Sequence, residues 1–157
     1  MQEQPIWLIP WVIFSVTAAL IVGKLVKSEP NIKGSGIPQV EGQVQGLISL
    51  NWWPVIWKKF IGGLLAIGSG LFLGREGPSI QLGSAVGQGI SNLTKGDDVE
   101  EKILLSSGAG AGVAAAFNAP LAGLMFVLEE VHHNFSPLLA ITTFSSALVA
   151  NFVSLNI

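Results

Sequence analysis

The stretch Gly74-Arg75-Glu76-Gly77-Pro78 is the most informative part of this sequence, because it places a charge pair and a proline inside a chain otherwise suited to a membrane. Residues 60–74 and 77–94, on either side of the pair, contain no other Asp, Glu, Lys or Arg. Ionisable groups at membrane depth are rare and usually face a protein interior or a water-filled path. We therefore predict a functional role for Glu76; the alternative is an interfacial loop between two helices.

The composition indicates an integral membrane protein. Of the 157 residues, 50% are hydrophobic and 11% charged, and the mean hydropathy is +0.59. The net charge of −2, without a dense basic cluster, argues against nucleic-acid binding. The absence of cysteine excludes thiol catalysis and cysteine-ligated metals, and no nucleophile with a positioned base is evident, so we expect no enzyme activity. We expect a multi-pass protein of the plasma membrane.

The apolar runs are too short for every helix to cross a bilayer. Helices are expected at about 6–27, 38–50, 54–73, 78–93, 101–117 and 120–131, with a last one from about 137. Three of these would reach only about 16–24 Å, against about 30 Å of hydrocarbon. Helix ends at membrane depth must be buried in protein or line a cavity. The sequence thus predicts an all-α integral membrane protein with broken and tilted helices, as in transporters.

Small residues recur every four positions on three of these segments. The rows are Gly62, Ala66, Gly70 and Gly74; Ser79, Gly83, Gly87 and Ser91; and Gly108, Gly112 and Ala116. Such rows let helix backbones approach closely in lipid, so we expect them to be packing seams without a direct chemical role.

Lysines and tryptophans indicate how the chain lies in the membrane. Lys24, Lys27, Lys33, Lys58 and Lys59 lie on both sides of residues 34–50, which predicts a cytoplasmic flank. The link 95–102 carries two lysines and four acids, and we expect it on the opposite face. Tryptophans 7, 11, 52, 53 and 57 fit aromatic belts at the two membrane surfaces, or else scattered core positions.

The loops Gly34-Ser35-Gly36-Ile37-Pro38 and Gly74-Arg75-Glu76-Gly77-Pro78 share one design. Their glycines permit sharp turns, and each proline fits the first helical position, where no amide hydrogen is needed. The free amides and the helix dipole then attract an anion, unless both loops are ordinary helix caps. The Ser35 hydroxyl can donate to the same anion. Glu76, charged, can occupy the site in the anion's place and can leave it when protonated.

Further along, Asn118-Ala119-Pro120 breaks an uncharged run into two helices, and the second ends at Glu129 and Glu130. Adjacent residues lie about 100° apart around a helix, so only one carboxylate can face a given interior path. A solvated acidic pair is the alternative. We interpret His132 and His133 as interfacial polar residues, because no third metal ligand is evident.

These residues resemble the CLC family of chloride channels and proton-coupled chloride transporters. The matching text is Gly34-Ser-Gly-Ile-Pro38, Gly74-Arg-Glu-Gly-Pro78 with Gln81-Leu-Gly83, and Ala114-Ala-Ala-Phe-Asn-Ala-Pro-Leu-Ala-Gly123 leading to Glu129-Glu130. The three motifs occur in the family's order, and the resemblance covers nearly the whole chain. Gln39 departs from the acid that many relatives carry.

The resemblance implies a role for each matching position. Ser35 and the backbone at Gly34 resemble the chloride contacts of the central and inner positions. Glu76 resembles the gating glutamate, and the amides from Arg75 to Gly77 would line the outer chloride position. Glu130 resembles the internal proton-transfer glutamate of exchangers. The implied function is proton-coupled chloride antiport by a homodimer, without metal or organic cofactor; a passive voltage- or pH-gated chloride channel is the alternative.

The family fold has two inverted halves that meet at the anion path, and residues 1–157 resemble most of the first half. In the family the second half supplies a tyrosine hydroxyl and a further helix N-terminus, and this sequence contains no tyrosine. We therefore expect the missing C-terminal half to be a partner of this chain. A truncated, non-transporting fragment is the other interpretation.

Overall fold

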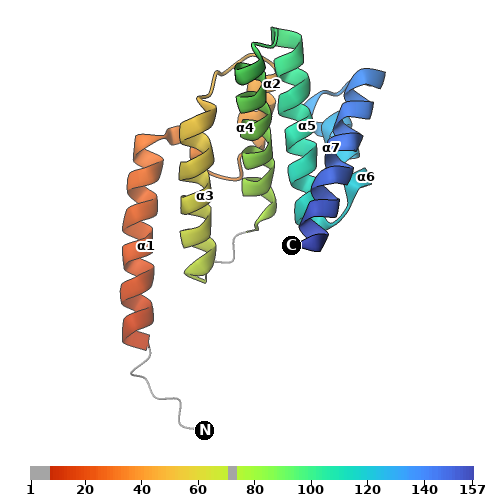
Figure 1. Cartoon of the computed structure of the whole chain (residues 1–157). Helices are drawn as coiled ribbons and strands as arrows, with labels where there is room; N and C mark the ends of the chain where they lie inside the picture. The colour runs from red at the N-terminus through yellow and green to blue at the C-terminus, as the bar shows by residue number, and fades with distance from the viewer. Residues whose placement is uncertain (1–7, 71–73) are drawn as a thin grey trace.

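The computed structural model describes residues 8–70 and 74–157, and within these ranges the regular structure is helical (Figure 1). The helices are α1 (Leu8–Ser28), the 3-10 turn η2 (Pro30–Ile32), α2 (Ile37–Val44), α3 (Trp52–Gly68), α4 (Glu76–Thr94), α5 (Asp98–Phe117), α6 (Pro120–Phe126), the π-helical turn η3 (Val127–Val131) and α7 (Pro137–Asn156). The all-α prediction is confirmed. Trp7 and the predicted helix end at 71–73 lie outside the described residues.

The long helices stand side by side in the order α1, α3, α4, α5, α7, and the short α2 and α6 lie among them (Figure 1). Among the residues that the structure describes, two helical segments are long and apolar enough to cross a membrane, Ile9–Ser28 and Pro137–Asn156. The predicted break between the two helices at 101–131 is confirmed: Asn118 adopts the left-handed conformation at φ 56° and ends α5, and Pro120 starts α6.

Two predicted helix ends are wrong by five residues or more. The helix predicted to reach residue 50 ends at Val44, because Gly46 takes φ 75° and the amides of Leu47 and Ile48 turn back to the Gly42 carbonyl. The helix predicted to reach residue 73 ends at Gly68, and Gly70, at φ 83°, lies in the turn beyond it. Gly70 and Gly74 therefore do not continue the predicted row of small residues on α3.

The other two rows form the predicted seam, between α4 and α5. A methyl group added to Gly83 would collide with the carbonyl oxygen of Gly108, and one added to Gly108 would collide with that of Gly83. Gly87 and Gly112 meet backbone of the opposite helix in the same way. The two backbones are thus in direct contact, which is the close approach that small residues allow in lipid.

The link before α5 lies beside the segment before α3, so its predicted place on the opposite face is wrong. Gln88 donates from Nε2 both to the carbonyl of Leu50, at 3.0 Å, and to Glu101 Oε1, at 3.1 Å. In Figure 1 the start of α3 and the link from α4 to α5 are at the same, upper end of the bundle. Acidic residues contribute little to membrane orientation, so the acids of this link gave no reason to separate it from the lysine-rich flank.

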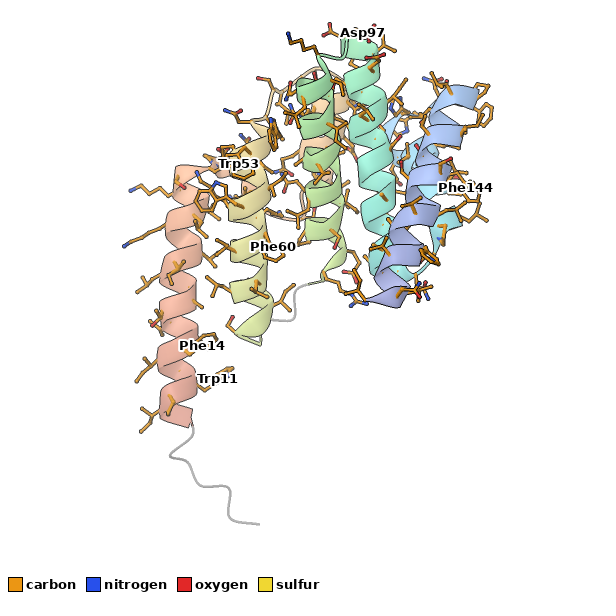
Figure 2. The ribbon with its side chains drawn as sticks, viewed as in Figure 1. Trp11, Phe14, Trp53, Phe60, Asp97 and Phe144 are labelled. Atoms are coloured by element: carbon orange, nitrogen blue, oxygen red, sulfur yellow. The ribbon has the colours of Figure 1, made fainter. Side chains whose placement is uncertain are left out.

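The tryptophans divide between surface and core. Trp11, Trp53 and Trp57 are exposed, and Figure 2 places Trp11 toward the lower end of α1 and Trp53 at the upper end of α3. Trp52 instead packs against the buried cluster of Val55 and Ala85. The exposed residues have the arrangement expected of aromatic belts, while Trp52 is a core residue.

Candidate functional site

The two predicted anion loops touch each other in the folded chain. A Cβ atom added to Gly77 would lie 2.6 Å from the carbonyl oxygen of Ser35 and 2.9 Å from its Cα. Any side chain at position 77 would therefore push the loops apart. Residues separated by 42 positions in the sequence are in this way brought to one place, and glycine is required at the contact.

The first loop is shaped by two left-handed glycines. Gly34 has φ 73° and Gly36, the residue before α2, has φ 98°. Between them the Ser35 side chain is exposed, and its Oγ accepts a long hydrogen bond of 3.4 Å from the Ile37 amide. The hydroxyl hydrogen stays free to donate. Pro38 occupies a position in the first helical turn of α2, where no amide donor is needed.

The second loop delivers Glu76 at the start of α4. The first amide to bond back along this helix is that of Ser79, to the Arg75 carbonyl at 3.1 Å, so the helix itself supplies no acceptor for the amides of Glu76 and Gly77. The helix begins two residues before the predicted start at Pro78, which makes Pro78 the third helical residue instead of the first. Its missing amide still falls within the turn whose donors are unpaired.

Both loops line one cavity of about 540 Å³, together with α1 and α3. Ser35, Glu76 and Gly77 are part of its wall, and so are Lys58 and Lys59 of α3. The Glu76 side chain is half-buried, and its carboxylate folds back against Gly74. The wall of the cavity thus brings a serine and the first turn of α4 together with one carboxylate, which is the chemistry of a candidate anion site with a built-in competing anion.

The Arg75 side chain contributes to the fold beside the site. Its Nη2 donates to the carbonyl of Ala116 at 3.3 Å, at the C-terminal end of α5. Those last carbonyls have no partner within their own helix. One guanidinium nitrogen thus bonds to α5, and Arg75 is not among the residues that line the cavity.

The acidic pair lies at the far end of the bundle from Glu76. Glu129 and Glu130 belong to η3, whose Val127 and Val131 are buried, and both carboxylates are exposed on the described chain. In Figure 1 the start of α4 is at the lower end of that helix, whereas η3 lies toward the upper end. The structure therefore brings Ser35 and Glu76 together and keeps Glu130 apart from them. Single π-helical turns often occur at functional sites.

His132 pairs with a buried hydroxyl next to the acidic pair. Its Nε2 lies 2.7 Å from Ser106 Oγ. Burial, and secondly the charge of Lys102, lower the pKa of His132. Neutral imidazole is favoured in this position.

Sequence reasoning missed the side chains that hold the first loop. Lys59 was interpreted only as part of a cytoplasmic flank, but it is 4% exposed and bonds two carbonyls of the loop. Gln39, the departure from the family pattern, donates from Nε2 to the Lys33 carbonyl at 3.1 Å, which an ionised acid cannot do. The available signal was a second lysine, directly after Lys58, in the middle of an otherwise apolar helix.

Comparison with known proteins agrees with the resemblance seen in the motifs. The family model described as voltage gated chloride channel matches residues 17–157. The H(+)/Cl(-) exchange transporter ClcA of Vibrio cholerae is 44% identical over 153 residues, which cover 95% of this chain and 32% of the relative. ClcA of Cronobacter sakazakii is 41% identical over 147 residues, covering 86% of this chain and 32% of the relative.

Among solved structures, a slow cyanobacterial Cl−/H+ antiporter superposes with a TM-score of 0.84 at 39% identity. The match covers 95% of this chain and 35% of that one. The chain spans about a third of the length of the relatives it matches. The family model, the sequence relatives and the superposition agree, and the chain belongs to the voltage gated chloride channel family.

Proposed function

We propose that this chain forms part of a proton-coupled chloride antiporter of the plasma membrane. The observation that carries the proposal is the contact of Ser35 with Gly77, which puts a hydroxyl, helix N-terminal amides and the Glu76 carboxylate on one cavity. The relatives are named as H(+)/Cl(-) exchange transporters. The transported chloride and protons are the only ligands this function needs, so we propose neither metal nor organic cofactor.

In this mechanism chloride binds where the amides around Arg75, Glu76 and Gly77 and the loop at Gly34 and Ser35 converge. Helix N-termini and a neutral hydroxyl attract an anion without the full charge of a lysine bonded directly to it, and moderate binding permits release. Ionised Glu76 competes for the same donors. Protonation removes that competition, so chloride entry and proton binding at Glu76 are coupled.

Glu130 is the proposed relay between the cytoplasmic solution and Glu76. The turn η3, which carries Glu130, lies toward the upper end of the bundle (Figure 1). The Glu130 side chain is exposed and is not among the residues that line the cavity. A proton route through Glu130 would thus reach Glu76 without sharing the chloride entrance. A passive chloride channel of the same fold is the second candidate, and it requires no role for Glu130.

The cavity also supports a partner for this chain. Its wall comes from α1, α3 and the two loops, and in the relatives about two thirds of the chain lies outside the matched region. We propose that a segment equivalent to the second inverted half completes the anion path, and that the full-length protein is a homodimer.

Flux measurements on the full-length protein in liposomes test the proposal. A chloride gradient with no initial proton gradient should drive protons uphill, and the extravesicular pH should change in step with chloride movement. Chloride flux without proton movement would favour the channel, and no anion flux would reject both candidates. The Glu76→Gln variant is the matched control, because it keeps the side-chain size and removes the titrating group.

A further inference from the structure

Residues 33–36, which carry Ser35, have no regular secondary structure, and side chains hold the backbone that leads into them. Four consecutive carbonyls accept side-chain hydrogen bonds: that of Asn31 from Gln81 Nε2 at 2.8 Å, Ile32 from Lys59 Nζ at 2.9 Å, Lys33 from Gln39 Nε2 at 3.1 Å, and Gly34 from Lys59 Nζ at 2.8 Å. Backbone groups outside helices need such partners when they are removed from water. One side chain, Lys59, supplies two of the four.

Lys59 is unusual for a lysine in its environment. Its side chain is 4% exposed, and within the described residues its ammonium bonds backbone carbonyls and no carboxylate. Burying a cation is costly unless hydrogen bonds compensate it, and bonds from a charged donor are stronger than neutral ones. The lysine next to it, Lys58, is half-buried and makes one long bond of 3.4 Å to the Ser28 carbonyl.

The hydrogen bond from Lys59 to the Gly34 carbonyl also fixes the direction of the Ser35 amide. In a trans peptide the carbonyl of one residue and the amide hydrogen of the following residue point in opposite directions from one rigid plane. Holding the Gly34 oxygen at Lys59 therefore directs the Ser35 amide away from Lys59. The same bond draws the negative end of that carbonyl toward a cation, so it repels an anion at Ser35 less.

We propose that Lys59 is a positioning residue for anion binding: it holds the carbonyls of Ile32 and Gly34 and thereby sets the Ser35 amide and hydroxyl for the anion. This inference rests on the proposed function, since it assumes that Ser35 meets chloride. It assigns Lys59 no direct contact with the ion. The effect comes from the orientation of the loop and not chiefly from the charge.

Three variants of the full-length protein separate orientation from charge. Lys59→Met removes both the donor and the charge, and Lys59→Gln keeps a donor and removes the charge. Lys58→Met removes one charge from the wall of the same cavity without touching the loop carbonyls. Chloride affinity is measured by calorimetric titration of the purified protein with chloride, and backbone exchange at residues 33–37 by hydrogen–deuterium mass spectrometry.

Lys59→Met should bind chloride about tenfold more weakly, the scale of one charge-assisted hydrogen bond, and its 33–37 amides should exchange faster. Lys59→Gln should stay within about threefold of the parent, because a neutral donor retains part of the bond. Lys58→Met should weaken chloride binding much less than Lys59→Met and should leave the exchange of the 33–37 amides unchanged, because Lys58 does not bond the loop carbonyls. If Lys58→Met weakened chloride binding as much as Lys59→Met, the proposal would be overturned in favour of a charge effect. The same holds if folded Lys59→Gln and folded Lys59→Met weakened chloride binding equally.

The remaining outcomes also decide the question. If Lys59→Met does not fold, Lys59→Gln carries the test, and if neither folds, Lys59 serves the fold as a whole and the proposal is wrong. Unchanged affinity in folded Lys59→Met would overturn it as well. A parent protein that binds no chloride would instead reject the proposed function, and the exchange data would still report whether Lys59 holds the loop.

Discussion

The α4–α5 seam and the cavity beside it are built in opposite ways. At the seam, Gly83 and Gly108 bring two backbones together with no room for a methyl group. The cavity next to it is left open over about 540 Å³. Helix α4 belongs to both regions: its glycine face is fixed against α5, and its first residue, Glu76, is on the cavity wall. The closely packed helices α4 and α5 thus fix the position of the candidate site, whereas the cavity at that site is open.

Helix α1, on the other side of the cavity, is packed much less closely than the α4–α5 seam. A methyl group added to Gly23 of α1 would meet nothing within 4 Å, and several large apolar side chains of α1 are exposed, Ile13 and Leu20 among them. In Figure 2, Phe14 and Trp11 project from the lower part of this helix. The two glycines, Gly23 and Gly83, therefore offer a direct comparison of the loose and the tight region.

The largest expected effect comes from breaking the seam. Gly83→Val places a branched side chain against the Gly108 backbone, which cannot move without separating α4 from α5. Overpacking of this kind costs about 1–3 kcal/mol or more, and we expect loss of folded protein after detergent extraction, measured by size-exclusion chromatography. Gly23→Val is the matched control and should remain folded. If both variants folded equally well, close packing of α4 against α5 would not be what holds α4 in place.

The next effect concerns Glu76, the proposed gate, at the N-terminal end of α4. Glu76→Ala removes the carboxylate from the cavity while the seam stays intact, so the protein should fold normally. Chloride flux in liposomes should lose its dependence on pH, and proton movement driven by chloride should cease. Steep pH dependence that survives in Glu76→Ala would show that another group competes with the anion.

Variants of Glu129 and Glu130 test whether the end of the bundle away from Glu76 takes part in coupling proton movement to chloride movement. Glu130→Gln should abolish uphill proton movement while chloride still flows, because the proposed relay would be lost and the cavity left unchanged. Glu129→Gln should have much less effect, since the side chains of adjacent residues on the helical turn η3 point in different directions. Both carboxylates are exposed here, so the pair differs in direction and not in burial. Proton pumping at the original ratio in Glu130→Gln would favour another donor.

The motifs predicted the two loops better than the sequence predicted the side chains that hold the first of them. The loops at Ser35 and Glu76 were evident because glycine and proline control the backbone locally, wherever the rest of the chain lies. The bonds from Lys59 to the Ile32 and Gly34 carbonyls were not evident, because they form only when α3 packs against the loop. The predicted end of the second helix failed for a different reason: the local stop at Gly46 was overlooked because the residues beyond it remain apolar.

A smaller effect is expected at Ser35, on the wall of the cavity. Ser35→Pro removes the hydroxyl and the amide donor, while Gly34, Gly36 and Pro38 continue to shape the loop. The protein should fold, and the preference for nitrate over chloride should rise, measured as relative flux of the two anions. Unchanged preference in folded Ser35→Pro would place the anion away from this hydroxyl.

The smallest effect concerns a polar contact on α5, the helix that forms half of the seam. Ser106 of α5 pairs with His132, whose pKa is lowered by burial and by the charge of Lys102. A lowered folded-state pKa means that this contribution to stability is complete above the ordinary value of 6.5 and is lost as the pH falls below it. His132→Gln should therefore flatten the fall in thermal stability of the detergent-purified protein between neutral pH and about pH 5, with a change of at most about 1 kcal/mol, the scale of one neutral hydrogen bond. Because this contact is separate from the α4–α5 interface, chloride affinity should not change; a parallel loss of affinity would mean that the seam and this end of α5 are coupled.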